Sequence, residues 1–497
     1  MSLVLNENKD HPLNSQIRLI VVLLLGLVFC FSTSAAADNP PTREAQSALR
    51  YLNKIRKDAG LRPFNWNSQL YRAAHNHALY LAKNRVISHF ESKGRSYFTG
   101  IRPGDRAVAQ GYNAYKVTEN FSSGQANTTE SIEGLMSAIY HRLAFLDPFV
   151  DEIGIGIIPF QKGYTFVYNM GNRKLNAACR TANSPKTEPH FRDMCRSTRP
   201  ISAKKVDSIT NQALQDSPPI IIWPTDKMTG VSPAFFEEIP DPLPNQSVSG
   251  YPVSIQFNPH RFPNAEVESF RLFDVKQGNL SLVSPLHLMQ ERNDPNKKLK
   301  KNHHVLFPLN RLKWGANYKA ELIVKINNSK KALIWSFNTK VMEYPMFEIA
   351  SKGELLHVVK DTTYAVYVKP NRRTPTIQNI QWEAPRSVQA AVNWEDKNTI
   401  LVTLSGQACR SVRFSIDNGT GFQIQIAKKD NINSNHEYLG ISEIACLQGA
   451  NRNTRGFLIK GKGEILRLKS GVEYWVEIQS ESNATKEVQL RYPEGLK

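Results

Sequence analysis

The chain has 497 residues, of which 41% are hydrophobic and 22% charged, a composition typical of globular rather than disordered proteins. This length exceeds what one hydrophobic core supports, so about three domains are expected. The net charge of +19 favours acidic partners such as anionic lipid or surface glycans, although it could equally serve solubility. The basic residues are spread along the chain and match no nucleic-acid-binding motif, so a nucleic-acid partner is not expected.

The N-terminus has the layout of a secretory signal. Arg18 precedes the apolar run 19–31, and small residues follow up to Ala37. The apolar run is short for a membrane span. We therefore predict a signal peptide over 1–37 and a mature protein that is secreted, periplasmic or at the cell surface, without a transmembrane domain.

Four cysteines remain after this signal, namely Cys179, Cys195, Cys409 and Cys446. An even number in an exported chain predicts two disulfides. Three pairings are possible, and chain order favours Cys179–Cys195 and Cys409–Cys446.

Two helices open the mature chain. Thr42 is the expected N-cap of a helix over 44–59, and Asn67 that of a second helix. His77 lies on the apolar face of the second helix and is therefore predicted to be a core histidine.

A third helix is expected to begin at Thr128 or Thr129 and to reach His141. Its apolar stripe consists of Ile132, Leu135, Met136, Ile139 and Leu143. A separate row of small residues leads to His141, and small side chains let a neighbouring segment approach. His141 is therefore expected to face a cleft rather than the core.

Strands are expected over 153–158 and 164–169. The glycines of the sequence EIGIG, at 152–156, allow close approach of another backbone. Before the third helix, Glu119 is expected in a turn-like segment and His89 in a polar gap. Helices followed by strands predict an α+β or layered αβα domain over 38–175.

The segment 176–217 is polar and basic and contains the first cysteine pair, so we predict a linker with a short helix near 202–214. Beyond it, short strand patterns between turn signals predict two all-β, sandwich-like domains over 218–340 and 341–497. The pieces LKWGANYKAELIVKI and IWSFNTK resemble bacterial Ig-like domains. The residues that match the pattern are Tyr318, Trp335, Phe337 and Thr339, and the three aromatic ones are expected in the core.

The first domain contains a series of short motifs in a fixed order: LNKIRKDAGL, AHNHALYLA, SHFESKG, DRAVAQGY, TENFSSG and YHRLAF. By these motifs it resembles the CAP superfamily (cysteine-rich secretory, antigen 5 and pathogenesis-related proteins, or SCP domains), in particular its bacterial branch. The resemblance implies an αβα sandwich with a cleft lined by two histidines and two acidic residues. By motif, three of these four positions are His89, Glu119 and His141. Thr118 stands where the pattern usually has Gly, and the eukaryotic G-H-[FY]-T-Q-V-V-W signature is absent.

The fourth, acidic residue is left open. Glu130 and Glu133 precede His141 on the expected third helix by about 16 and 12 Å, at 1.5 Å per residue. Neither could share a metal ion with His141 on one straight helix.

The predicted cleft admits three functions. Two imidazoles and a carboxylate would suit a zinc ion on His89 and His141, or another ligand such as a lipid or wall glycan, with the β domains presenting it. The same residues could act as acid and base in a hydrolase. Glu119 could instead bridge the histidines as a structural network, with adhesion carried by the β domains. No nucleophile elbow, H-E-x-x-H helix or free cysteine is present, so binding is favoured over catalysis and no cofactor is required.

Overall fold

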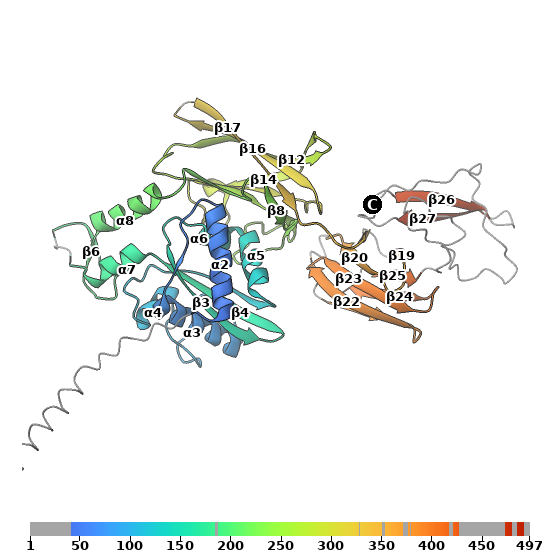
Figure 1. The fold of residues 1–497 in the computed structure, drawn as a ribbon, viewed down its shortest axis with the longest axis horizontal. Helices are drawn as coiled ribbons and strands as arrows, with labels where there is room; N and C mark the ends of the chain where they lie inside the picture. Colours follow the sequence, from blue (N-terminus) through green and yellow to red (C-terminus); the bar gives the residue numbers. More distant parts are fainter. Residues whose placement is uncertain are drawn as a thin grey trace, which may run out of the picture.

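The computed structural model describes residues 41–183, 187–327, 329–349, 353–370, 376–377, 379–416 and 421–426, together with the backbone of strands 473–479 and 485–491. The predicted signal peptide and Cys446 lie outside these residues. The chain is an αβα domain followed by β-sandwich domains, as predicted (Figure 1). No helix within the described residues is long and apolar enough to cross a membrane.

Helices cover both faces of the first domain's four-stranded sheet, which has the order β1-β3-β4-β2. Alternating side chains of β3 and β4 face opposite layers, so Ile153 and Ile155 join the core with α2 and α5, whereas Val167 joins the core with α3. The predicted caps are confirmed, since Thr42 and Asn67 accept hydrogen bonds from backbone amides in the first turns of α2 and α3. The elements are α2 (Arg43–Asp58), β1 (Asn65–Trp66), α3 (Ser68–Asn84), α4 (Pro103–Ala109), β2 (Thr118–Gln125), α5 (Thr128–Ser137), α6 (Ile139–Phe145), β3 (Glu152–Phe160) and β4 (Gly163–Gly171).

Two local predictions in this domain are wrong. Glu119 lies in strand β2 and not in a turn, because residues 118–125 pair with β4. The third helix breaks at Ala138, whose backbone is extended (φ −80°, ψ 117°). The break leaves the carbonyl of Met136 to accept hydrogen bonds from Arg142 Nε and Tyr251 Oη, so contacts with the next domain replace a helical hydrogen bond.

The segment expected to be a linker is structured and packs on the first domain. It contains α7 (Arg173–Arg180), β5 (His190–Phe191), β6 (Ile201–Ser202) and α8 (Ala203–Gln215). The predicted Cys179–Cys195 disulfide is confirmed, and Cys195 forms a β-bridge with Ala114. Ile209 of α8 belongs to the same hydrophobic cluster as Leu52 of α2. The segment therefore extends the first domain.

The second domain is a sandwich of two sheets with strand orders β14-β15-β11-β7 and β13-β12-β16-β17-β8. Tyr318, Trp335 and Phe337 are buried in it, as predicted, and Thr339 is buried as well. Its elements are β7 (Ile220–Trp223), β8 (Met228–Val231), β9 (Ala234–Phe235), β10 (Ser249–Gly250), β11 (Val253–Phe257), β12 (Glu266–Lys276), β13 (Asn279–Leu282), β14 (Leu286–Gln290), η2 (Glu291–Asn293), β15 (His303–Pro308), β16 (Asn317–Ile326) and β17 (Ser329–Thr339).

The third domain is a smaller sandwich with strand orders β18-β20-β23-β22 and β19-β25-β24-β21. Each sandwich has a tyrosine whose hydroxyl accepts a hydrogen bond from the backbone amide five residues upstream, Lys313 to Tyr318 and Val359 to Tyr364. Cys409 is disulfide-bonded, and its predicted partner Cys446 lies outside the described residues. The strands are β18 (Met346–Ile349), β19 (Leu355–Val358), β20 (Thr363–Val368), β21 (Ile380–Glu383), β22 (Val388–Asp396), β23 (Thr399–Gly406), β24 (Ser411–Ile416), β25 (Gly421–Ile426), β26 (Glu473–Gln479) and β27 (Thr485–Arg491).

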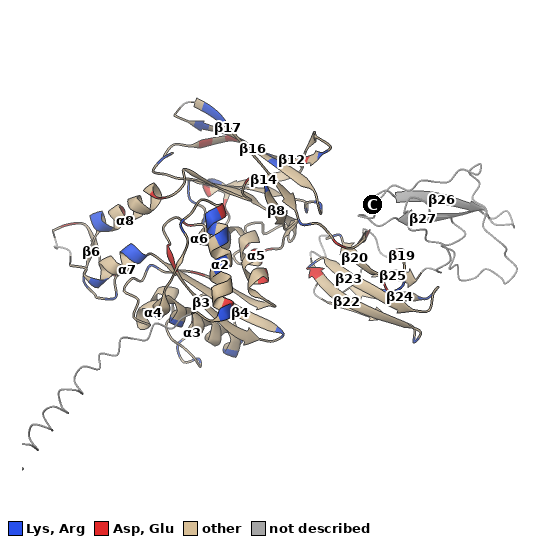
Figure 2. Ribbon diagram, in the orientation of Figure 1, with Lys and Arg blue, Asp and Glu red and all other residues tan. Residues whose placement is uncertain are grey.

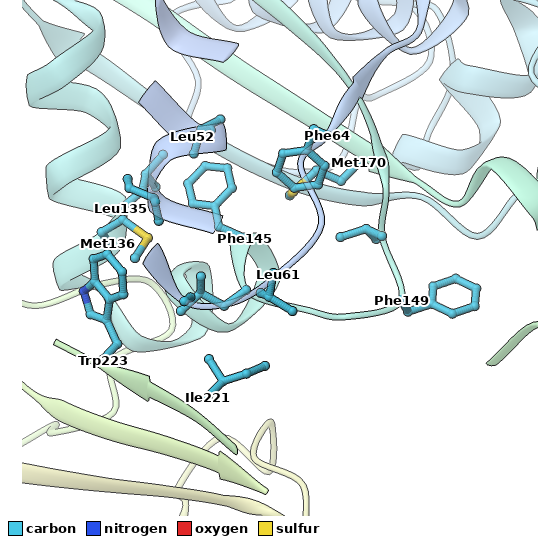
Figure 3. Close-up of a cluster of buried hydrophobic side chains, with 14 of the residues drawn as sticks. Leu52, Leu61, Phe64, Leu135, Met136, Phe145, Phe149, Met170, Ile221 and Trp223 are labelled. Atoms are coloured by element: carbon cyan, nitrogen blue, oxygen red, sulfur yellow. The ribbon is translucent and has the colours of Figure 1, made fainter. Parts of the chain in front are cut away.

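The first and second domains share one hydrophobic core. Trp223 and Ile221 of β7 lie beside Met136 and Leu61 of the first domain (Figure 3). Arg142 is fully buried at this interface, where its guanidinium donates to the carbonyl of Pro252 at 2.7 Å and to Ser254 Oγ at 3.0 Å. The two domains are therefore packed as one body.

The glycines of EIGIG set the distance between α3 and β3. A Cβ on Gly154 would lie 1.9 Å from the backbone nitrogen of Tyr71, and one on Gly156 would lie 2.4 Å from the backbone of Ala74. Neither neighbour can move without displacing the helix, so the predicted close approach is confirmed.

We expect Gly154→Ala to lower the free energy of unfolding by roughly 3 kcal/mol or more, because the added methyl group overpacks against a helix backbone. Gly134→Ala is the matched control. Its added Cβ meets nothing within 4 Å, and alanine favours the helical conformation of α5, so a gain of up to about 1 kcal/mol is expected. Urea unfolding of both variants measures the difference, and equal effects would contradict the close approach.

Candidate functional site

Five ionisable side chains meet at one end of the first domain, from three regular elements and the irregular connection between α3 and α4. His77 comes from α3, Arg106 from α4 and Glu119 from β2, whereas His89 and Glu91 belong to the connection. Four of the five side chains are at most 1% exposed, and only His89 reaches the surface, with 37% of its side chain exposed. We call this group the buried charge cluster.

Glu119 is the centre of the cluster. Its Oε1 lies 3.0 Å from His89 Nδ1 and 3.6 Å from His77 Nε2, and its Oε2 accepts a hydrogen bond from Arg106 Nη2 at 2.7 Å. Burial by itself would raise the pKa of Glu119, but the charges of His77 and Arg106 and the hydrogen bond from His89 outweigh burial and lower the pKa to about 2. Glu119 is therefore a buried side chain that is negatively charged at neutral pH.

His77 is held between oxygen atoms that can only accept hydrogen bonds. Its Nδ1 lies 2.9 Å from Glu91 Oε1, and its Nε2 lies 3.1 Å from the carbonyl oxygen of Ser88. Both ring nitrogens of His77 therefore face hydrogen-bond acceptors. The prediction that His77 is a buried histidine is confirmed, but its surroundings are ionic rather than apolar.

Other hydrogen bonds of the cluster join its side chains to the backbone of the connection between α3 and α4. Glu91 Oε2 accepts from the amides of Thr99 and Gly100, at 2.6 and 3.3 Å. Arg106 Nη1 donates to the carbonyls of His89 and Ile101, at 3.1 and 3.2 Å. These bonds fix the two ends of an irregular connection to the helices and strand beneath it.

His141 does not join this cluster. Its Nδ1 lies 2.8 Å from Glu238 Oε2 of the second domain, and the same carboxylate accepts from the amide of Tyr140 at the start of α6. Only the backbone of His141 reaches towards Glu119, because its carbonyl accepts from Asn120 Nδ2 at 2.8 Å. The structure thus brings His89 and Glu119 together and places His141 at a domain interface.

The sequence-based proposal of zinc on His89 and His141 gains no support from this geometry. Within the described residues, no group of three or more His, Cys, Asp or Glu side chains is arranged to hold a metal ion. In the buried charge cluster, Arg106 already pairs with the carboxylates of both Glu91 and Glu119. The residues present therefore do not fit a zinc ion.

Glu130 and Glu133, considered for the fourth position, have other partners. Glu130 accepts from the amide of Ala126, and Glu133 accepts from the hydroxyl of Tyr51. The acidic residue that contacts the cluster is Glu91, and His77 and Arg106 also belong to it. Glu91 stands two residues after His89 in SHFE, and Arg106 is the arginine of DRA, so both lie within motifs of the resemblance.

Neither serine near the predicted site in the sequence is placed for catalysis. Ser88 Oγ accepts from the amide of Phe90, and Ser137 Oγ donates to the carbonyl of Gly134. The exposed histidine is therefore oriented by a carboxylate but is not in contact with a hydroxyl nucleophile among these candidates.

Comparison with known proteins identifies the first domain. The family described as "CAP: Cysteine-rich secretory protein family" matches residues 49–170, about a quarter of the chain. That region is a CAP domain. No curated protein sequence matches the chain.

Solved structures similar to this chain include bacterial proteins with low identity. An extracellular SCP-domain protein from Bacillus anthracis is 20% identical over 26% of this chain and 40% of its own, with a TM-score of 0.23. An outer surface protein from Borrelia burgdorferi is 20% identical over 26% of this chain and 93% of its own, with a TM-score of 0.24. A tandem of titin Ig domains is 14% identical over 42% of this chain and 96% of its own, with a TM-score of 0.16. This chain thus covers less than half of the Bacillus protein.

The charge of Glu119 makes stability depend on pH. Because its pKa falls from 4.5 in the unfolded chain to about 2 in the folded protein, its contribution is complete above about pH 5.5 and is lost as the pH falls from 4.5 towards 2. We expect Glu119→Gln to lower the free energy of unfolding by about 3 kcal/mol at neutral pH and by much less near pH 3.

Urea unfolding at a series of pH values measures this effect, with the exposed Glu266→Gln as the control that unfolds like the wild type. A difference between wild type and Glu119→Gln that stays constant down to pH 3 would show that the carboxylate charge is not what stabilises the cluster.

Proposed function

We propose that the protein is exported and that its CAP domain docks on membranes or other lipid surfaces that carry anionic head groups. The observation that carries this proposal is the surface of residues 83–102, the end of α3 and its connection to α4. This stretch combines exposed apolar side chains with exposed basic ones and has no exposed acidic side chain. We call it the 83–102 segment.

The apolar side chains of this segment are exposed to an unusual degree. The exposed fractions are 71% for Ile87, 58% for Phe90, 49% for Tyr97 and 42% for Ile101. Ile101 lies close to Phe90, because the amide of Glu91 donates to the carbonyl of Ile101 and Arg106 bridges the carbonyls of His89 and Ile101. Such grouped apolar exposure marks an interaction surface.

The charge of the segment has one sign. Its exposed basic residues are Lys83, Arg85, Lys93, Arg95 and Arg102. Its only acidic residue, Glu91, is buried in the charge cluster. Each basic side chain near an anionic leaflet contributes about 1 kcal/mol, and each apolar side chain that enters the acyl boundary adds to this. The combination of exposed apolar and exposed basic side chains matches the acyl layer and the anionic head groups of a membrane, which favours lipid over a glycan.

The buried charge cluster explains how such a surface persists. A connection without regular structure would otherwise fold its apolar side chains inward, leaving backbone groups unsatisfied. Here His77, Glu91 and Arg106 satisfy backbone groups at residues 88, 89 and 99–101. In addition, Tyr80 Oη accepts from the amide of Ser92. The cluster therefore works as a scaffold that presents the segment.

One contact favours hydrolysis as a second candidate. The hydrogen bond between His89 Nδ1 and the buried carboxylate of Glu119 is the arrangement of an oriented general base, with Nε2 directed away from its partner. Turnover of ester, peptide or glycan substrates that His89→Gln abolishes, without a change in unfolding, would favour this activity over docking alone.

Cosedimentation with vesicles tests the docking proposal. We expect the mature protein to bind vesicles of phosphatidylcholine with phosphatidylglycerol, and to bind pure phosphatidylcholine far more weakly. The double variant Ile87→Ser, Phe90→Ser is expected to weaken binding at least roughly tenfold, because two apolar side chains no longer enter the bilayer. Lys93→Gln, Arg95→Gln should weaken binding and reduce its dependence on salt.

Matched controls lie on the second domain. Leu280 and Leu282 of β13 are about as exposed as Phe90, and Lys330 and Lys331 of β17 are exposed lysines. The double variants of these pairs are expected to bind vesicles like the wild type. If the control variants lost as much vesicle binding as the variants of the 83–102 segment, the docking proposal would be wrong.

A further inference from the structure

A cavity of about 400 Å³ lies where α6 of the CAP domain, helix α8 and the second domain meet. Its apolar wall has a contribution from each part, with Leu143 of α6, Leu214 of α8 and Phe257 of β11. This volume is within the range of small-molecule sites, which also lie preferentially between domains. The buried charge cluster and the 83–102 segment contribute no residue to it.

Positively charged side chains are part of the lining of this cavity. Lys116, Lys298 and Lys300 contribute to its lining, and Asp147 is the one acidic residue there. None of the three lysines forms an ion pair with any residue that the structure describes. Partial burial lowers the pKa of the Lys116 ammonium, Asp147 opposes this, and the nearby Lys300 lowers it further. The cavity thus has an excess of cationic groups.

Two further polar side chains line the cavity, and each has a donor group that makes no hydrogen bond to the described residues. Gln256 of β11 is only 5% exposed, and its side-chain amide makes no hydrogen bond to the residues described. His303 is 8% exposed, and its Nδ1 accepts from the amide of Lys300 at 3.3 Å. Burial, with Lys300 and His304 adding to it, lowers the pKa of His303 to about 3, so the neutral ring carries its proton on Nε2.

Donor groups that face a cavity without a protein acceptor can be satisfied by a ligand or by water. Here an amide and an imidazole N–H line the same cavity as an apolar wall and three ammonium groups that form no ion pair with the described residues. One of these, the ammonium of Lys116, lies 4.0 Å from the ring centroid of Phe149. We propose that this interdomain cavity binds a small organic anion, with its carboxylate near the lysines, Gln256 and His303 and its apolar body against the wall.

Calorimetric titration of the full mature protein with octanoate tests this site. We expect one octanoate to bind per chain. Both 1-octanol, which lacks the negative charge, and inorganic phosphate, which lacks the apolar chain, should bind at least roughly tenfold more weakly. Lys300→Gln is expected to weaken octanoate binding roughly tenfold. Lys301→Gln, which removes the same charge one residue outside the cavity lining, is the matched control and should bind like the wild type.

A second variant tests the cavity itself. Ala144 lines the cavity and is half-buried, so Ala144→Phe should fill the space and abolish octanoate binding while its melting temperature without ligand stays close to that of the wild type. The Ile87→Ser, Phe90→Ser variant should retain full octanoate binding, which separates this site from membrane docking. Equal affinity for octanol and octanoate, or equal losses in Lys300→Gln and Lys301→Gln, would overturn the proposal.

Discussion

Buried arginines that donate to backbone carbonyls hold this structure together. Arg56, Arg106 and Arg142 are each at most 1% exposed. A guanidinium has five N–H donors in a fixed plane, which suits it to carbonyls left free where the chain has no regular structure. Arg56 donates to the carbonyls of residues 62, 145, 147 and 150, and Arg106 to those of 89, 100 and 101. Arg142 reaches those of 136 and 252.

This constraint gives the family motifs of the CAP domain a physical meaning. Arg56 is the arginine of LNKIR, Arg106 that of DRA and Arg142 that of YHR, so each motif places a buried cation under an irregular segment. The carboxylates of Glu91 and Glu119 then balance the positive charge of Arg106. Several hydrogen bonds of this cluster end on backbone groups of the irregular connection between α3 and α4, so the cluster supports that connection. Basic and acidic residues occur in each of the three domains within the described residues (Figure 2).

The sequence was sufficient wherever local chemistry decides structure. The Thr42 and Asn67 caps, the glycines of EIGIG, the Cys179–Cys195 pair and the strands of the second domain each follow from residues close in the chain. His141 could not be placed in this way. Its partner Glu238 lies 97 residues away, and the break at Ala138 that redirects it depends on Arg142 and Tyr251 of two different domains. The place of Glu91 in the charge cluster was not predicted, because one glutamate in a sequence does not indicate whether its side chain is buried.

The same interface determines how the domains can present the 83–102 segment. Glu119 and Asn120 are neighbours on β2, where the first belongs to the charge cluster and the second donates to the carbonyl of His141, whose ring contacts the second domain. The second domain is therefore fixed relative to the segment through a strand and a shared core. The third domain has a separate hydrophobic cluster and meets the second through polar contacts of Arg311 with Asp396 and Thr399, and of Lys340 with Glu395. Since such contacts are weaker than a shared core, motion within the described part of the chain is expected between the second and third domains, leaving the CAP domain and its neighbour to move as one body.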